Sequence, residues 1–286
     1  MSPEAHTLFR PARWTSPVIF SSPHSGRDYP ADFLAASVLD ERSIRSSEDA
    51  FVDLLFDCAP RLGMPLIAAH GPRAYLDLNR AAEELDPAVI DGVLRQAHNP
   101  RVSSGLGVIP RVVSGGRAIY RGKLPLAEAE ARIDRHWRPY HAALARLVAE
   151  CRAQFGQVVL VDCHSMPHEA LDSHARPGQP RPDVVLGDRF AAAAGREVVD
   201  RIEAAFAGAG LRVARNTPFA GAYITQAYGR PSLGQHAVQV EIDRALYMDE
   251  ATITPRPEFE TFRLLIEGVV AEISAIGRTD AALAAE

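Results

Sequence analysis

The chain has 286 residues, of which 47% are hydrophobic and 23% are charged, and its formal net charge is -5. This composition is typical of a globular protein with a sizeable core, and no apolar run approaches the roughly 18 residues that a bilayer span needs. The negative charge and the lack of a basic run argue against nucleic acid as the main partner.

The first residues and the cysteines predict the compartment. The opening Met1-Ser-Pro-Glu-Ala-His carries an acid and no apolar segment, unlike a signal peptide. Cys58, Cys151 and Cys163 lack CxxC spacing, which favours a reducing compartment over a disulfide framework. We therefore expect a cytoplasmic protein; the sequence does not indicate its oligomeric state.

Apolar runs that alternate with helical patterns predict an α/β fold. In chain order, the expected strands are 17–22, 65–69, 74–78, 157–162, 183–186, 211–215, 222–227 and 236–242. The expected helices are 49–62, 125–154, 188–208 and 258–276, the third with Asp188 as its N-cap. No shift in composition marks a boundary, so we expect one domain over residues 1–286.

Segment 98–123 interrupts this alternation. It is rich in glycine, proline and serine, which predicts a loop-rich excursion with short strands that folds over the site. The single lysine, Lys123, is followed by leucine, so a phosphate-binding loop of the Walker type is not expected.

Two histidines follow expected strands. His24 comes after 17–22, and His164 follows the apolar run that ends at Asp162. In open α/β sheets, ligands collect beyond the carboxyl ends of the strands, so both histidines can face one site. A catalytic zinc site takes three protein ligands, and Glu48 and Asp49 both offer the third. The ordinary alternatives are hydrogen-bonded loop histidines and acids that complement a helix dipole.

Familiar hydrolase signatures are missing. His168-Glu169-Ala-Leu-Asp172 has aspartate where HExxH requires histidine, and no GxSxG elbow is present. Cys163 and His164 are adjacent on an expected strand and so point to opposite faces, which predicts that Cys163 packs in the core.

Two further segments are expected to form walls of the site. The two-residue period of 74–78 places Arg73, Asp77 and Asn79 on one face, with Arg80 just beyond. An arginine there can hold a substrate carboxylate, or Arg73 can form an ion pair with Asp77. In 236–242 the same period exposes Glu241, a carboxylate suited to general base catalysis.

Taken together, these segments resemble the N-formylglutamate amidohydrolases. The matching pieces are Pro23-His-Ser-Gly, Glu48-Asp49, Arg73-x-x-x-Asp-Leu-Asn-Arg80, Asp162-Cys-His-Ser, Asn216-Thr-Pro-Phe-Ala-Gly-Ala-Tyr-Ile-Thr225, Gln239-Val-Glu-Ile and Leu246-Tyr-Met-Asp-Glu250. The resemblance implies a three-layer α/β sandwich with a central mixed sheet, similar to zinc carboxypeptidases and aspartoacylases. It also implies a deformylase of histidine degradation that yields formate and L-glutamate.

The resemblance further implies roles for individual residues. Zinc is expected on His24, Asp49 and His164, with Glu241 as the base, although these ligand types also suit iron, cobalt or nickel. Arg73 and Arg80 are expected on the two substrate carboxylates, and Asn79, Asn216 and Tyr223 are expected to line the site. Asp162 is expected to orient His164.

Two alternatives remain open at the level of sequence. One keeps the metal site but acts on another N-acyl amino acid, a formimino compound or a small peptide. The other is a non-catalytic protein that binds a small anionic metabolite through the same arginines.

Overall fold

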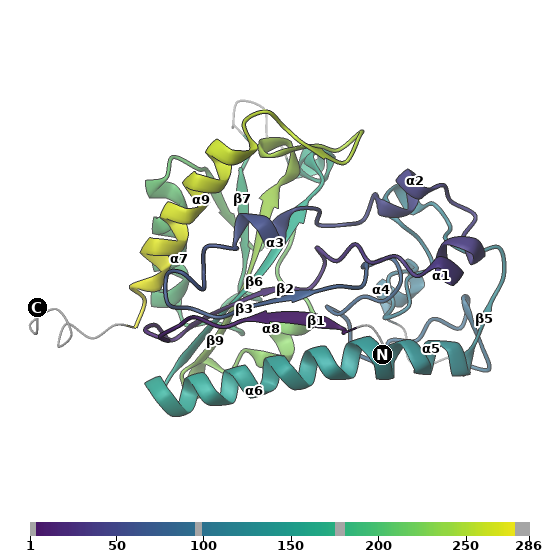
Figure 1. The fold of residues 1–286 in the computed structure, drawn as a ribbon, viewed down its shortest axis with the longest axis horizontal. Coiled ribbons are helices and arrows are strands. Elements are labelled where there is room, and N and C mark those ends of the chain that lie inside the picture. Colours follow the sequence, from purple (N-terminus) through teal and green to yellow (C-terminus); the bar gives the residue numbers. More distant parts are fainter. Residues whose placement is uncertain (1–3, 95–98, 175–180, 278–286) are drawn as a thin grey trace, which may run out of the picture.

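A mixed sheet of seven strands forms the centre of the molecule, in a computed structural model that describes residues 4–94, 99–174 and 181–277 (Figure 1). The spatial order of the strands is β1 (His6–Phe9), β3 (Leu66–Ala69), β2 (Val18–Ser22), β6 (Val158–Met166), β9 (Gln235–Asp243), β7 (Val184–Gly187) and β8 (Val213–Arg215). The inner strands β3, β2, β6 and β9 are parallel, whereas β1 and β7 run antiparallel to their neighbours β3 and β9. Two short pairs, β4 (Ile90–Asp91) with β5 (Leu124–Pro125) and β10 (Met248–Asp249) with β11 (Thr254–Pro255), lie outside this sheet.

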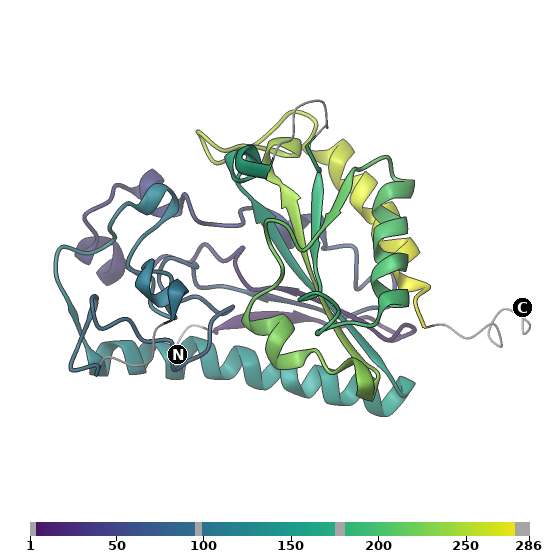
Figure 2. The same cartoon turned by 180° about the vertical axis from the view of Figure 1, so that it is seen from behind.

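Helices cover both faces of the sheet, which confirms the expected three-layer sandwich (Figures 1 and 2). One layer holds α3 (Val52–Leu55), α7 (Arg196–Gly208) and α9 (Phe259–Ser274), and the other holds α6 (Arg138–Phe155) and α8 (Tyr223–Tyr228). The remaining helices are α1 (Ala31–Ala36), α2 (Glu41–Arg45), α4 (Pro100–Ser103) and α5 (Leu126–Arg132). No helix of the described ranges is long and apolar enough to cross a membrane.

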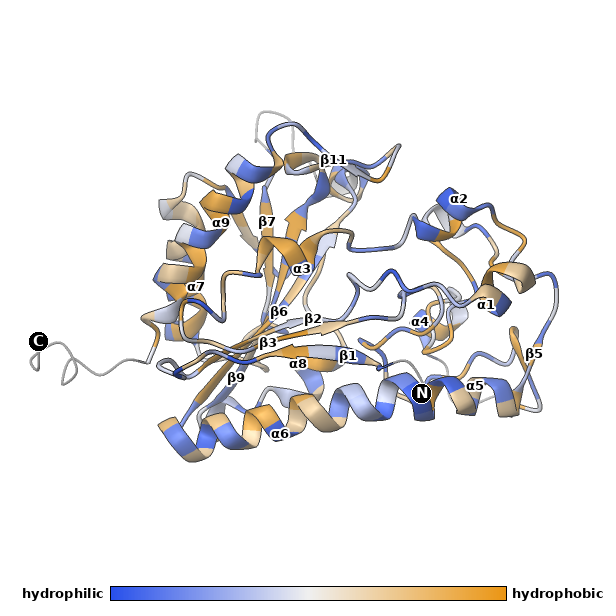
Figure 3. Cartoon of the chain, viewed as in Figure 1, coloured by the Kyte–Doolittle hydropathy of each residue, from blue (hydrophilic) through white to orange (hydrophobic). Residues whose placement is uncertain are grey.

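Strand β6 shows why the sheet is buried and where it stops being apolar. Val161 and Cys163 pack into the core beneath α7 and α9, while Leu160 packs into the core beneath α6. The central strands are accordingly drawn largely in hydrophobic colours in Figure 3. By the two-residue period, Asp162 and His164 continue the face of Leu160. The α6-side face of the sheet therefore changes from apolar to polar toward the carboxyl end of β6, and Cys163 is a core residue, as expected.

The long helix expected at 125–154 is confirmed, with one irregularity. It consists of α5, a π-helical turn at Ile133–Trp137 and α6, which ends at Gly156 in a left-handed conformation with φ 74°. The helix expected at 258–276 is also confirmed, as α9.

Two expected strands are wrong. Residues 74–78 form turns instead, because the backbone N–H groups of Tyr75 and Leu76 both donate to the carbonyl of Pro72. Residues 222–227 belong mostly to α8, whose first turn is held by the Asn79 side chain, since Oδ1 accepts from the N–H of Ile224 at 2.7 Å. The first segment is bent by hydrogen bonds within its own turn, and the second is capped by a residue far away in sequence.

Two expected helices begin later than predicted. Segment 49–62 is helical only at α3, because Phe51 is left-handed and the N–H of Asp49 donates to the carbonyl of His24. The helix expected from 188 begins at Arg196, and its N-cap is Gly195 rather than Asp188. Residues 189–191 have positive φ, which no helix can accommodate.

The described part of the expected excursion contains α4 instead of the predicted short strands, apart from isolated bridges between Val112 and Ala118 and between Tyr120 and Ser37. The first residue of the excursion, 98, lies outside the described ranges. The strand expected at 157–162 continues as β6 to Met166.

Candidate metal and catalytic site

Three side chains from distant parts of the chain converge at the carboxyl edge of the sheet. His24 follows β2, His164 lies near the end of β6, and Asp49 comes from the connection between α2 and α3. The Nδ1 atoms of His24 and His164 lie 3.4 Å and 2.9 Å from Oδ2 of Asp49. All three side chains are buried, and their ligand atoms lie within 4.8 Å of one another. The structure thus brings together the three residues that the sequence suggested as metal ligands.

A carboxylate lies behind each histidine. His24 Nε2 is 2.7 Å from Asp77 Oδ1, and His164 Nε2 is 2.9 Å from Asp162 Oδ2. With each Nε2–H donating to its carboxylate, both Nδ1 atoms turn their lone pairs toward Asp49. Histidines that bind metals usually have such a carboxylate partner, which fixes the tautomer and the ring orientation.

Asp49 is held from its other side by Arg244, which follows β9 directly. The Arg244 guanidinium donates from Nη2 to Asp49 Oδ1 at 3.0 Å and from Nε to the hydroxyl of Ser165 at 3.1 Å. Burial opposes ionisation of Asp49, but the imidazoles of His164 and His24 hold its pKa well below the ordinary value. Asp49 is therefore a carboxylate with one oxygen fixed by arginine and the other facing the histidines.

Glu48, the other acid considered from the sequence, points elsewhere. Its Oε1 accepts from the Tyr29 hydroxyl at 2.6 Å and from Arg45 Nε at 2.9 Å, and its Oε2 accepts from Arg45 Nη2. Because these contacts occupy both carboxylate oxygens, the geometry favours Asp49 over Glu48 as the acidic ligand.

Glu241 lies beside the cluster on β9, where it is the Cα partner of His164 across the ladder. Its Oε1 accepts from Gln239 Nε2 at 2.7 Å, and 7% of the residue is exposed. Burial raises the pKa of Glu241 to about 7; the neighbouring His164 opposes this rise and Asp49 adds to it. A carboxylate with this pKa suits a group that accepts and returns a proton near neutral pH.

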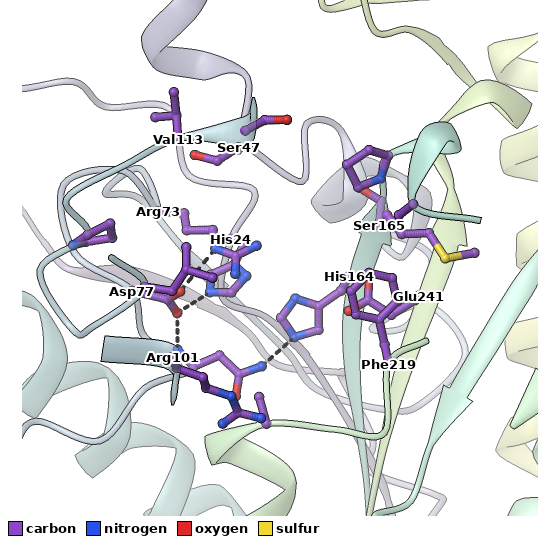
Figure 4. Close-up of a pocket in the computed structure, with 18 of the residues that line it drawn as sticks. His24, Ser47, Arg73, Asp77, Arg101, Val113, His164, Ser165, Phe219 and Glu241 are labelled. Atoms are coloured by element: carbon purple, nitrogen blue, oxygen red, sulfur yellow. Dashed lines mark hydrogen bonds and ion pairs between the residues drawn. The ribbon is translucent and has the colours of Figure 1, made fainter. Parts of the chain in front are cut away.

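His24, His164, Glu241 and Arg244 are among the residues that line a cavity of about 610 Å³ (Figure 4). Its other walls come from the excursion, from the end of β6 and from the Pro218–Ala222 segment. In the view of Figure 4, Arg73, Asp77 and Arg101 lie to the left of the cavity, while His164, Glu241 and Phe219 lie to the right. The volume suits a small metabolite.

The residues predicted to bind substrate occupy different places. Arg73 lines the cavity and forms the ion pair with Asp77 that the sequence had offered as an alternative, with Nε 3.1 Å from Oδ2. Arg80 and Asn79 also line the cavity. Asn79 joins three elements, since its Nδ2 lies 3.3 Å from Asp162 Oδ2 and 3.3 Å from Gln239 Oε1 while its Oδ1 caps α8.

Asn216 and Tyr223 lie outside the residues that line the cavity. The Asn216 side chain instead accepts from the N–H groups of Asp188 and Phe190 and donates to the Asp188 carboxylate at 2.6 Å. The ring of Tyr223 packs against Trp137 and His141.

The structure adds two arginines to the predicted site. Arg244 comes one residue after the β9 carboxyl end, a position that the strand prediction already marked as an edge of the site. Arg101 lies on α4, within a segment whose composition gave no periodic signal, so only the fold brings it to the cavity.

The cluster has the properties of a metal site. Nδ1 of His24 is buried and has no hydrogen-bond partner among the described residues, a situation that costs free energy unless another species binds there. Two imidazole nitrogens and one carboxylate oxygen are a ligand set that divalent transition metals accept, and a catalytic zinc site uses three such ligands. The residues therefore fit a single divalent cation.

Comparisons with known proteins give concordant matches over most of the chain. The sequence model for the family "N-formylglutamate amidohydrolase" matches residues 16–248. The N-formylglutamate deformylase of Pseudomonas aeruginosa is 33% identical over 269 residues, which cover 92% of this chain and 94% of that protein. The N-formylglutamate deformylase of Pseudomonas putida is 30% identical over 237 residues, 82% of each chain. The crystal structure of an N-formylglutamate amidohydrolase from Ralstonia eutropha superposes with a TM-score of 0.88 at 36% identity, covering 95% of this chain and 98% of that one.

Proposed function

The chain belongs to the N-formylglutamate amidohydrolase family, and on this premise we propose that it hydrolyses N-formyl-L-glutamate to formate and L-glutamate in a metal-dependent reaction. The relatives named as N-formylglutamate deformylases support the reaction. The convergence of two histidine Nδ1 atoms and one carboxylate beside Glu241 is the observation that carries the mechanism. We propose histidine degradation as the pathway, as the family resemblance implies, and the cytoplasm as the compartment.

His24, Asp49 and His164 would hold the metal, and zinc is the ion that we propose. When bound, zinc supplies Lewis acidity that polarises a carbonyl oxygen and lowers the pKa of water. Asp77 and Asp162 keep the two imidazoles in the tautomer that directs Nδ1 toward the ligand position. Arg244 orients Asp49.

Glu241 is proposed as the proton carrier. Its carboxylate lines the cavity, and Gln239 fixes Oε1 by a hydrogen bond. Glu241 takes a proton from the attacking water and delivers it to the amide nitrogen as the bond between formyl carbon and nitrogen breaks. The products are formate and L-glutamate, whose amino nitrogen has received the proton. One carboxylate thus serves both proton transfers.

The cavity arginines select an anionic substrate. Arg80 is proposed to bind a substrate carboxylate, because its guanidinium lines the cavity and its bonds within the described part of the chain go only to the carbonyl oxygens of Leu106 and Asn79. Arg73 also faces the cavity, with only Nε engaged by Asp77. Asn216 and Tyr223 are proposed to support the wall from outside, through the Asp188 loop and α8.

The test is a measurement of both products. The purified protein should release formate and L-glutamate in equal amounts from N-formyl-L-glutamate, and it should act more slowly on N-acetyl-L-glutamate, N-formimino-L-glutamate and small peptides. Faster hydrolysis of another member of this panel would assign the metal site to that substrate. Binding of glutamate without hydrolysis of any substrate would instead support a metabolite-binding protein.

A further inference from the structure

The four arginines that line the cavity are not equivalent. Arg73 pairs with Asp77, and Arg244 pairs with Asp49, each at 3.0–3.1 Å. Asp49 is itself a candidate metal ligand, and Asp77 contacts another, His24. These two arginines therefore have their charge compensated by the cluster itself.

Arg80 and Arg101 have no such compensation. Arg80 donates from Nε to Leu106 O at 2.8 Å and from Nη1 to Asn79 O at 2.7 Å, and Arg101 donates from Nη2 to Gly221 O at 3.4 Å. Within the described ranges, neither forms an ion pair with a carboxylate. Carbonyl oxygens satisfy N–H groups but do not neutralise a guanidinium charge.

Arg80 and Arg101 line the same cavity. Arg80 is 6% exposed, and burial lowers its pKa; the carboxylates of Asp77 and Glu84 oppose this, while the positive charges of Arg73 and Arg101 lower the pKa further. Two like charges that face one cavity are unfavourable unless an anion binds between or beside them.

The charges around the cavity indicate how many negative charges that anion carries. Arg73 and Arg244 match the carboxylates of Asp77 and Asp49. Arg80 and Arg101 are then left with two positive charges. A ligand with two carboxylates would balance them.

Resting on the proposed function, we infer that Arg80 and Arg101 together form the subsite for the two carboxylates of the substrate, with Arg101 on the side-chain carboxylate and Arg80 on the α-carboxylate. The order follows from position. The Arg80 guanidinium donates from Nη1 to the carbonyl of Asn79, whose side chain contacts His164 and Asp162, so we assign Arg80 to the carboxylate nearer the metal cluster. Arg101 lies on α4 in the excursion, and its guanidinium donates to the Gly221 carbonyl. We therefore assign Arg101 to the carboxylate farther from the metal cluster.

Local structure prepares Arg101 for this role. Its helix α4 is capped by Asn99, whose Oδ1 accepts from the Arg101 N–H at 2.9 Å and whose Nδ2 donates to Glu84 Oε2 at 3.2 Å. The bond from Arg101 to Gly221 is long, at 3.4 Å, so a carboxylate acceptor can replace the carbonyl at little cost. Arg101 thus determines specificity from an element that carries none of the candidate metal ligands.

The experiment compares substrates that differ by one carboxylate. In N-formyl-L-glutamine the side-chain carboxylate becomes a neutral amide, and in 4-formamidobutanoate the α-carboxylate is absent. The wild-type protein should prefer N-formyl-L-glutamate over both. Arg101→Met should lower the preference for N-formyl-L-glutamate over N-formyl-L-glutamine by about tenfold to a hundredfold, mainly through KM, since a charge-assisted hydrogen bond pair is lost. Hydrolysis of N-formyl-L-glutamine should change less than about threefold.

Arg80→Met should show the opposite selectivity, with loss of discrimination against 4-formamidobutanoate. Arg101→Lys keeps the positive charge but loses the planar guanidinium that can bind a carboxylate with two hydrogen bonds. This variant should show an intermediate preference for N-formyl-L-glutamate over N-formyl-L-glutamine. The matched control is Arg152→Gln, which removes an exposed arginine on α6 and should leave every ratio unchanged. An equal loss by Arg101→Met on both the glutamate and the glutamine substrate would overturn the inference, because it would indicate a general effect on the wall of the cavity.

A binding measurement separates this inference from the proposed function. Calorimetry of the metal-loaded protein should show that L-glutamate binds more tightly than L-glutamine, and Arg101→Met should remove the difference. If wild-type protein releases no formate but still shows this arginine-dependent difference, the proposed reaction fails and the subsite stands. Formate release with unchanged selectivity in Arg101→Met would refute the subsite alone.

Discussion

Arg244 donates to Oδ1 of Asp49 at 3.0 Å and thereby leaves Oδ2 as the oxygen that faces both histidines. The pair links the residue that follows β9 to the connection between α2 and α3, so the acidic ligand is oriented from an element far away in sequence. Arg244 also holds the Ser165 hydroxyl, which comes directly after His164.

Arg244→Met should therefore weaken zinc binding by about tenfold to a hundredfold, the usual effect of removing an outer contact to a metal ligand. The measurement is the zinc dissociation constant, obtained by competition with a chromophoric chelator. Arg244→Lys should restore part of the affinity. As a control, Arg212→Met breaks a comparable arginine–aspartate pair with Asp183, away from the cavity, and should leave zinc affinity unchanged. Equal affinity in wild type and Arg244→Met would remove this positioning role.

Replacing each of the two adjacent acids by its amide tests which of them is the metal ligand. Asp49→Asn should abolish stoichiometric zinc binding, because it removes the charge between the histidines. Glu48→Gln should keep the metal but lower the melting temperature, since Glu48 holds Tyr29 and Arg45 in a buried network. Metal analysis and thermal unfolding of both variants decide the point, and the reverse pattern would make Glu48 the ligand.

Glu241→Gln should separate metal binding from turnover. Because the carboxylate contributes proton transfer and no metal contact, zinc content should stay near one per chain while kcat falls by about a hundredfold to ten-thousandfold. Steady-state kinetics together with metal analysis measure both. A variant with unchanged kcat would show that another group carries the proton.

His141 gives a prediction for stability at low pH. Burial lowers the pKa of this histidine to about 4, although hydrogen bonding to the Leu78 carbonyl opposes the change. The unfolded chain therefore binds the proton more readily, so this stabilisation is complete above a pH of about 6.5 and is lost as the pH falls toward about 4. Denaturant unfolding at pH 7 and pH 4.5 should show a loss in wild type that exceeds the loss in His141→Gln by roughly 1–3 kcal/mol. Parallel losses in the two proteins would exclude His141 as the cause.

The sequence predicted the layers of the fold because burial leaves a clear signal. Strands such as β6 are continuous apolar runs, and the stripe through α5 and α6 repeats at helical spacing, so both were found with small errors at the ends. Residues 222–227 were misassigned because their conformation depends on a contact from elsewhere, the Asn79 side chain at the start of α8. No local pattern can report such a long-range cap.

The candidate site shows the same division. His24 and His164 were visible because polar residues end apolar strands, and Asp162 because it shares a face with His164. Arg101 and Arg244 were missed because an arginine in a loop has the same local appearance whether it faces solvent or a cavity. The resemblance singled out Asn216 as part of the matching segment 216–225, but only the structure shows that its side chain is engaged with Asp188.

The central claim is that His24, Asp49 and His164 hold a metal on which the hydrolysis of N-formyl-L-glutamate depends. The most direct measurement follows formate release and metal content together in purified protein, after exhaustive chelation and after stepwise return of zinc. Activity should disappear with the metal and return in proportion to zinc, reaching its plateau at one ion per chain. Full activity in protein shown to be free of metal would contradict it.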